Sequence, residues 1–69
     1  MTPTTLARLG TLLYGPQWRM SLANALGVNR KSLIRWRSGE WPIPEGVPGE
    51  LKEIMRERIA ELRKEIESL

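Results

Sequence analysis

Residues 22–39 read LANALGVNRKSLIRWRSG, an order that predicts two short helices meeting across a sharp turn. Ala23 is small enough to let the two helices cross closely, and Gly27 can adopt the positive φ that such a turn requires. Leu33 and Trp36 are three residues apart, so they share one face of the second helix and can anchor it on a core. The stretch therefore predicts a helix-turn-helix motif.

Capping residues and prolines divide the rest of the chain into further elements. Thr2 followed by Pro3 is a favourable helix start, and Asn29 can cap the helix after the turn. The stretch EWPIPEGV, residues 40–47, contains two prolines that no regular element tolerates. Its apolar side chains, Trp41 and Ile43, are expected to fold back onto the core. Helices are expected at about residues 2–14, 16–26, 29–37 and 48–69.

The fold class is therefore an all-α bundle in which residues 1–47 form a compact helix-turn-helix domain and residues 48–69 a longer C-terminal helix. A chain of 69 residues is marginally stable alone, and without cysteine it has no disulfide to brace it, so a homodimer is favoured. Histidine and aspartate are also missing. We therefore expect no metal, no cofactor and no enzymatic activity, because the usual zinc ligands, general bases and nucleophiles are depleted.

Positive charge is concentrated in the first two thirds of the sequence. Residues 1–47 carry six basic and two acidic groups, a net charge of +4, whereas residues 48–69 carry five basic and six acidic groups, a net charge of −1. This asymmetry favours binding of a polyanion by the first segment.

The run LANALGVNRKSLIRWRSG, together with PIP at residues 42–44, resembles the helix-turn-helix region of the phage repressor and Cro family. The likeness covers roughly residues 16–47. It implies a DNA-binding regulator, often dimeric, whose base-contacting side chains fall at Arg30, Lys31 and Arg35. Contacts with the DNA backbone fall at Gln17, Trp18, Arg19 and Asn29. The chain differs in having one helix after the loop, where the family domain commonly has two.

The chemistry of these side chains supports the same assignment. Arginine matches the O6 and N7 atoms of guanine in the major groove, and one such bidentate pair contributes about 1–3 kcal/mol of discrimination. Ile34 shares this face and is assigned either to a thymine methyl or to the edge of the core. Ser32 and Ser38 are also expected to contact the DNA backbone. Trp18 is expected to belong to the core, and donation of its indole N–H to a phosphate is the alternative. Trp41 could likewise support a contact with the DNA backbone instead of covering the core. For the basic residues the alternative is an ordinary solvated face.

Apolar residues in the C-terminal segment recur at spacings of four, three, four and three: Met55, Ile59, Leu62, Ile66 and Leu69. This is a short heptad seam with isoleucine at a and leucine at d, which favours a parallel two-stranded pair. The alternative is that the stripe folds back on its own domain. Leu51 and Ile54 are expected to pack on the core.

Three classes of function follow from these features. The first is a dimeric transcriptional autorepressor from a phage or mobile element that binds an inverted-repeat operator through the major groove; an anti-CRISPR-associated regulator is a narrower version. The second is an antitoxin-like or adaptor module whose C-terminal helix binds another protein, and the third, an enzyme, is disfavoured. With no apolar run of about 18 residues and no signal-peptide pattern, we expect a bacterial cytoplasmic protein, nucleoid-associated when bound. No membrane partner or small-molecule ligand is expected.

Overall fold

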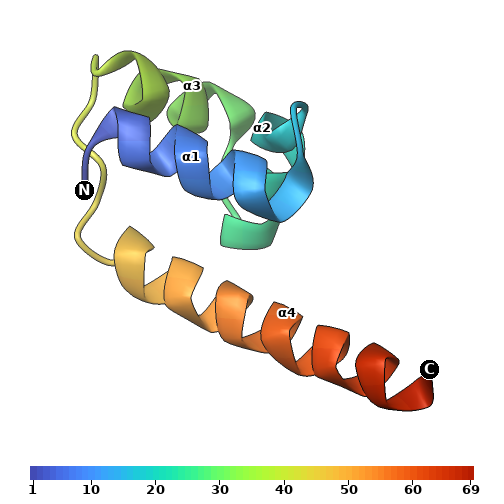
Figure 1. Ribbon diagram of the computed structural model, residues 1–69. Helices are drawn as coiled ribbons and strands as arrows, with labels where there is room; N and C mark the ends of the chain where they lie inside the picture. Colours follow the sequence, from blue (N-terminus) through green and yellow to red (C-terminus); the bar gives the residue numbers. More distant parts are fainter.

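A computed structural model describes all residues 1–69 as four α-helices without strands (Figure 1). Their bounds are α1 Pro3–Tyr14, α2 Trp18–Leu26, α3 Arg30–Ser38 and α4 Val47–Ser68. The first three helices form a compact bundle, and α4 runs beneath it and extends well past it (Figure 1). The all-α architecture predicted from the sequence is confirmed.

Two helices start at the side-chain caps that the sequence indicates. The Thr2 hydroxyl oxygen accepts a hydrogen bond from the Thr5 backbone N–H at 3.1 Å. The Asn29 side-chain oxygen accepts one from the Lys31 backbone N–H at 2.8 Å. Each cap satisfies one of the N–H groups that the first turn of a helix leaves without a partner.

The second helix begins later than expected, at Trp18 instead of Pro16. Gly15 ends α1 with φ 82°, and Pro16 and Gln17 are used in the turn that redirects the chain. Gln17 has φ −103° and ψ 48°, outside the helical region, and its side chain makes no capping hydrogen bond. The bounds of α3 and α4 lie within one residue of the expected ones.

Gly27 forms the sharp corner between α2 and α3. Its backbone is left-handed, with φ 68° and ψ 30°. The Gly27 N–H donates to the Asn24 carbonyl at 3.2 Å, and the Val28 N–H donates to the Ala23 carbonyl at 2.9 Å. These two bonds make a Schellman motif, which satisfies the last carbonyls of α2 while Val28 packs against the core. The expected role of the glycine is confirmed.

One apolar core joins all four helices. Its eight buried residues are Leu6, Trp18, Leu22, Ala23, Leu33, Trp36, Val47 and Leu51. The first turns of α4 therefore share the core of residues 1–47. Ile54 is half-buried.

Arg58 fixes α4 against the end of α1. Its guanidinium donates a hydrogen bond to the Leu13 carbonyl at 3.0 Å and lies 5.5 Å from the centre of the Tyr14 ring. The Leu13 carbonyl belongs to the last turn of α1, where carbonyl groups lack helical partners. The direction in which α4 leaves the bundle is thus set by a polar contact as well as by the core.

Gly10 marks the closest approach of α1 to Trp18. A Cβ at this buried position would lie 2.3 Å from Cε3 and 2.6 Å from Cδ2 of the indole. We expect Gly10→Ala to lower the free energy of unfolding by about 1–3 kcal/mol, because the buried ring has to shift. Gly49→Ala in α4 meets nothing within 4 Å, so it should instead raise stability by about 0.5–1 kcal/mol. Urea denaturation measures the free energy of unfolding of both variants. If Gly10→Ala were stabilised as much as Gly49→Ala, the indole would not pack on Gly10.

Candidate nucleic-acid interface

The third helix carries its basic side chains outside the core, and of the predicted base-contacting ones Arg35 is half-buried. Leu33 and Trp36 are buried, while Arg30, Lys31 and Ile34 are exposed. Ile34 is 43% exposed. It therefore lies on the surface and is available for an apolar contact.

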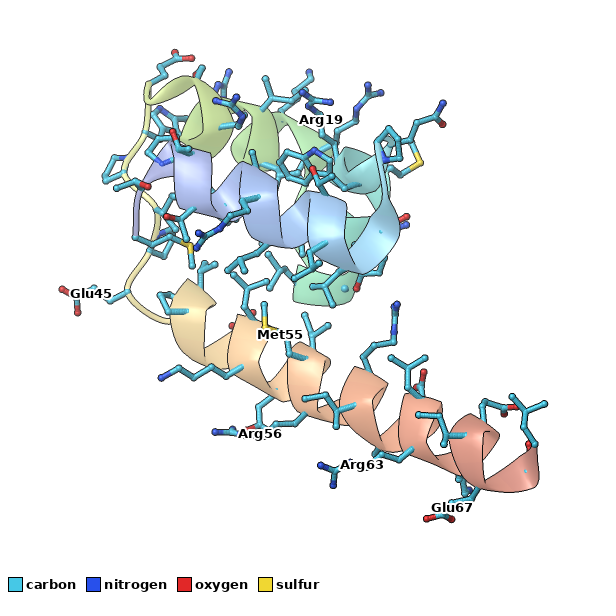
Figure 2. The ribbon with its side chains drawn as sticks, viewed as in Figure 1. Arg19, Glu45, Met55, Arg56, Arg63 and Glu67 are labelled. Carbon is cyan, nitrogen blue, oxygen red and sulfur yellow. The ribbon has the colours of Figure 1, made fainter.

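The start of α2 adjoins this surface. One hollow of about 300 Å³ is lined by residues that include Gln17, Arg19 and Arg30. Gln17 and Arg19, predicted to contact the DNA backbone, therefore lie next to Arg30, which is predicted to contact a base. Figure 2 shows Arg19 on the side of the bundle away from α4. Without a side-chain cap, the first N–H groups of α2 are left to an external acceptor, and an anion is favoured there.

The charge on this part of the chain is not offset by carboxylates. Residues 1–39 contain no acidic residue and six basic ones: Arg8, Arg19, Arg30, Lys31, Arg35 and Arg37. The two ion pairs of the structure, Arg56–Glu53 and Arg58–Glu61, both lie within α4. The cations of α2 and α3 form no ion pair with a carboxylate, so their charge can attract a polyanion.

Arg35 differs from Arg30 and Lys31 because its guanidinium stacks on an aromatic ring. Its guanidinium carbon lies 4.3 Å from the centre of the Trp41 ring. The Trp41 backbone N–H also donates to the Arg35 carbonyl at 3.2 Å. Of the two residues expected to fold back, only Ile43 packs against the core, while Trp41 is exposed and stacks on Arg35 instead. The sequence analysis did not predict this stacking. The one signal for it in the sequence is a tryptophan that closely follows a basic helix.

Several other predicted backbone contacts are restricted by their surroundings. Trp18 is only 3% exposed, so it is a core residue and offers little surface to DNA. The Ser38 hydroxyl donates its hydrogen to the Arg35 carbonyl at 3.1 Å, which leaves no donor for a phosphate. Asn29 uses its side-chain oxygen as a cap and retains its amide group. Ser32 is half-buried on α3.

The predicted seam of α4 becomes more exposed along the helix. Met55 is half-buried against the core, so it belongs in part to its own bundle. Ile59, Leu62 and Ile66 are 49%, 55% and 69% exposed, and Leu69 is fully exposed. The exposed part of the seam therefore begins at Ile59.

Three further findings concern the chain as a whole. None of its helices combines the length and the apolar character needed to cross a lipid bilayer. No group of three or more metal-ligating side chains is placed to hold an ion. No protein-family model, curated protein or solved structure matches the chain.

Proposed function

We propose that this protein is a sequence-specific regulator of transcription that binds double-stranded DNA as a dimer. The observation that supports the proposal most is the exposed face of α3, which carries Arg30, Lys31 and Ile34 with no carboxylate partner. A helix fits the major groove, where every base pair presents a different pattern of donors and acceptors. The glycine corner at Gly27 sets the angle at which α2 supports this helix.

The proposed roles follow from the position of each group. Arg30 and Arg35 would each donate two hydrogen bonds to a guanine, and Ile34 would contact a thymine methyl. Gln17 and Arg19, at the start of α2, would hold the adjacent phosphates and so fix the register of α3 in the groove. Specificity would then reside in α3, and much of the affinity in α2.

A two-fold dimer gives the mechanism its geometry. It would place two copies of α3 about 34 Å apart, one turn of duplex, on an inverted repeat. Once one half-site is occupied, binding of the second becomes effectively intramolecular, which raises the overall affinity. A dimer bound at a promoter would exclude polymerase, and repression of its own gene would make protein concentration the controlling variable.

The salt dependence of binding tests for phosphate contacts. If each subunit neutralises about three phosphates, the affinity of the dimer should fall by about 10³-fold between 50 and 200 mM salt, because counterions are released on binding. Gel-shift titrations at several salt concentrations measure the slope. A flat response would contradict a DNA-binding role and favour a protein partner.

Trp41 is expected to act as a positioning residue for Arg35. Trp41→Ala removes the ring on which the guanidinium lies, so discrimination between operator and scrambled DNA should fall by about 3- to 10-fold per subunit, while Trp41→Phe retains most of it. Competition gel shifts measure discrimination, and thermal unfolding checks that stability is retained. Unchanged discrimination in Trp41→Ala would show that the stacking does not orient Arg35 for base recognition.

The exposed seam of α4 supports a second candidate, a module that binds another protein through this helix. Ile59, Leu62 and Ile66 are the residues that such a partner would cover. This function needs no basic α3. Substitution of Arg30 would therefore leave partner binding intact, whereas it would impair a DNA-binding regulator.

A further inference from the structure

The core holds only the first turns of α4. Val47 and Leu51 are the buried residues of this helix, and Met55 is half-buried against the core. From Leu51 the helix continues to Ser68, a further distance of about 26 Å at 1.5 Å per residue. Most of α4 therefore projects from one short anchor, as Figure 1 shows.

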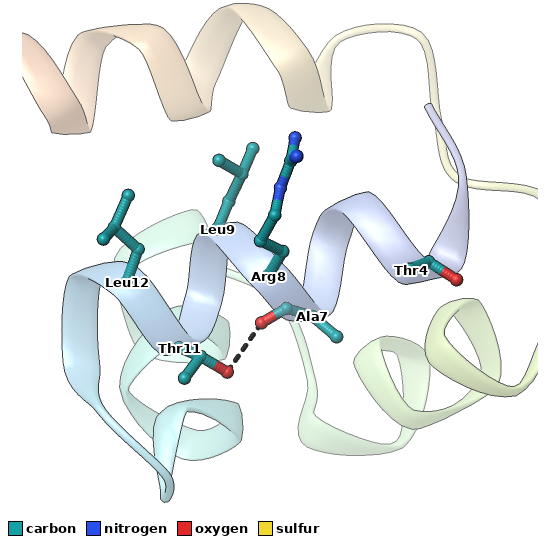
Figure 3. Close-up of a pocket in the computed structure, with 6 residues that line it drawn as sticks. All are labelled: Thr4, Ala7, Arg8, Leu9, Thr11 and Leu12. Atoms are coloured by element: carbon teal, nitrogen blue, oxygen red, sulfur yellow. Dashed lines mark hydrogen bonds between the residues drawn. The ribbon is translucent and has the colours of Figure 1, made fainter.

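Apolar packing leaves space beside the projecting part of α4. A groove of about 350 Å³ lies between the end of α1 and α4, and its apolar lining residues are Leu12, Leu13, Met55, Ile59 and Leu62. Leu12 is 78% exposed, although Figure 3 shows it on the side of α1 that faces α4. Because side chains do not fill this space, apolar contacts alone do not fix the angle between α1 and α4.

Arg58 bridges the two helices beside this groove. Its guanidinium donates a hydrogen bond to the Leu13 carbonyl at 3.0 Å and lies 5.5 Å from the centre of the Tyr14 ring. Its Nε atom lies 3.9 Å from a carboxylate oxygen of Glu61 on its own helix. The bond to Leu13 is the only hydrogen bond that joins α4 to another helix. Arg58 therefore holds the angle that the apolar side chains leave open.

We infer that Arg58 is a positioning residue that fixes the distance between the two half-sites recognised by the dimer. The inference rests on the proposed function, in which the exposed seam of α4 joins the subunits and α3 reads each half-site. Leu13 and Tyr14 end α1, and residues 15–17 lead from there directly to the start of α2. Arg58 thus connects the dimerisation helix to the segment that places the start of α2 on the DNA backbone.

The length of α4 makes the half-site distance sensitive to its angle. Leu62, in the middle of the exposed seam, lies about 16 Å along the helix from Leu51, so a tilt of about 10° moves it by about 3 Å relative to the bundle. Successive base pairs lie about 3.4 Å apart along the duplex. A firmly held α4 would therefore select one half-site separation, whereas a loosely held one would accept several.

The spacing preference of Arg58→Met tests this role. Methionine retains the aliphatic stem and loses the bond to Leu13 and the ring contact; the fold should persist because the Arg58 side chain is 39% exposed. The probe is the duplex selected by the unmodified chain from random DNA, with one base pair inserted between its half-sites. The insertion should weaken binding of the unmodified chain by about 10-fold or more, and that of Arg58→Met by about 3-fold or less, because the loosely held dimer still engages both half-sites.

Two further variants separate the contact from the charge. Arg56→Met removes the same charge on the side of α4 away from the bundle, so the insertion should weaken its binding as much as that of the unmodified chain (Figure 2). Arg58→Lys keeps a charged donor and should show an intermediate loss. Equal losses in Arg58→Met and the unmodified chain would overturn the inference and leave DNA binding itself intact.

A measurement without DNA tests the angle directly. Because the chain contains no cysteine, nitroxide labels can be attached at Ala25→Cys on α2 and Lys64→Cys on α4, both exposed positions. Pulsed EPR on labelled chains diluted with unlabelled protein gives the distance within one subunit. Arg58→Met should widen the distance distribution by about 3 Å, the displacement that a tilt of about 10° produces, and Arg56→Met should not.

The two measurements keep this inference apart from the proposed function. An unchanged distribution in Arg58→Met would show that Arg58 does not hold α4 and would overturn the inference, whatever the chain binds. If the unmodified chain binds no duplex, the proposed function fails and Arg58 sets no half-site distance. A widened distribution together with a lost spacing preference is the expected result.

Discussion

Replacing Leu62 by glutamate is expected to convert the dimer to monomers and to lower operator affinity by about 10²- to 10⁴-fold. Leu62 lies in the middle of the exposed seam and also lines an apolar groove between the end of α1 and α4. A buried carboxylate without a partner strongly opposes association. In a dimer, binding of the first α3 raises the effective concentration of the second α3 at its half-site. A monomer has no such second contact, and this sets the size of the loss in operator affinity.

Sedimentation and gel shifts on the same preparations measure this effect. Ala60→Glu is a matched control, because it adds the same charge two residues earlier at an exposed position outside the seam. It should remain dimeric and bind the operator normally. If Leu62→Glu also remains a dimer, the seam is assigned to the wrong residues; if it is monomeric yet binds equally tightly, DNA recognition does not require the dimer.

Arg30→Ala is expected to have the other large effect. A bidentate arginine–guanine contact contributes about 1–3 kcal/mol of discrimination, so a dimer with two half-sites should lose roughly 2–6 kcal/mol of operator preference. Binding to unrelated duplexes should weaken far less, because only the phosphate attraction of one charge per subunit is removed. Competition of operator against scrambled DNA in gel shifts gives the ratio.

Arg8→Ala is the matched control for charge. Arg8 lies on α1, and Figure 3 shows it on the side that faces α4, away from the exposed face of α3. Its removal lowers the net charge equally but should leave the ratio of operator to scrambled binding unchanged. Equal losses for Arg8→Ala and Arg30→Ala would mean that Arg30 contributes charge without reading a base.

Local chemistry made much of the fold predictable from the sequence. The Thr2 and Asn29 caps, the glycine at Gly27 and the spacing of Leu33 and Trp36 act within a few residues, so their effects can be recognised in the sequence. These signals predicted four helices and the exposed face of α3. The start of α2 was misplaced because a proline after glycine suits a turn as well as the first position of a helix.

The contacts missed by the sequence prediction depend on tertiary packing. A glycine inside α1 would normally weaken a helix, and only the position of Trp18 explains why Gly10 has no side chain. Stacking of Trp41 on Arg35 requires the chain to reverse after α3. The bond from Arg58 to the Leu13 carbonyl joins residues 45 positions apart.

Selection of bound sequences from random duplex DNA, using the purified full chain, tests the proposed mode of recognition most directly. We expect an inverted repeat with guanine in each half-site and half-site centres about one helical turn apart. Enrichment of no sequence, or of a motif that Arg30→Ala selects equally well, would contradict recognition of the major groove by α3.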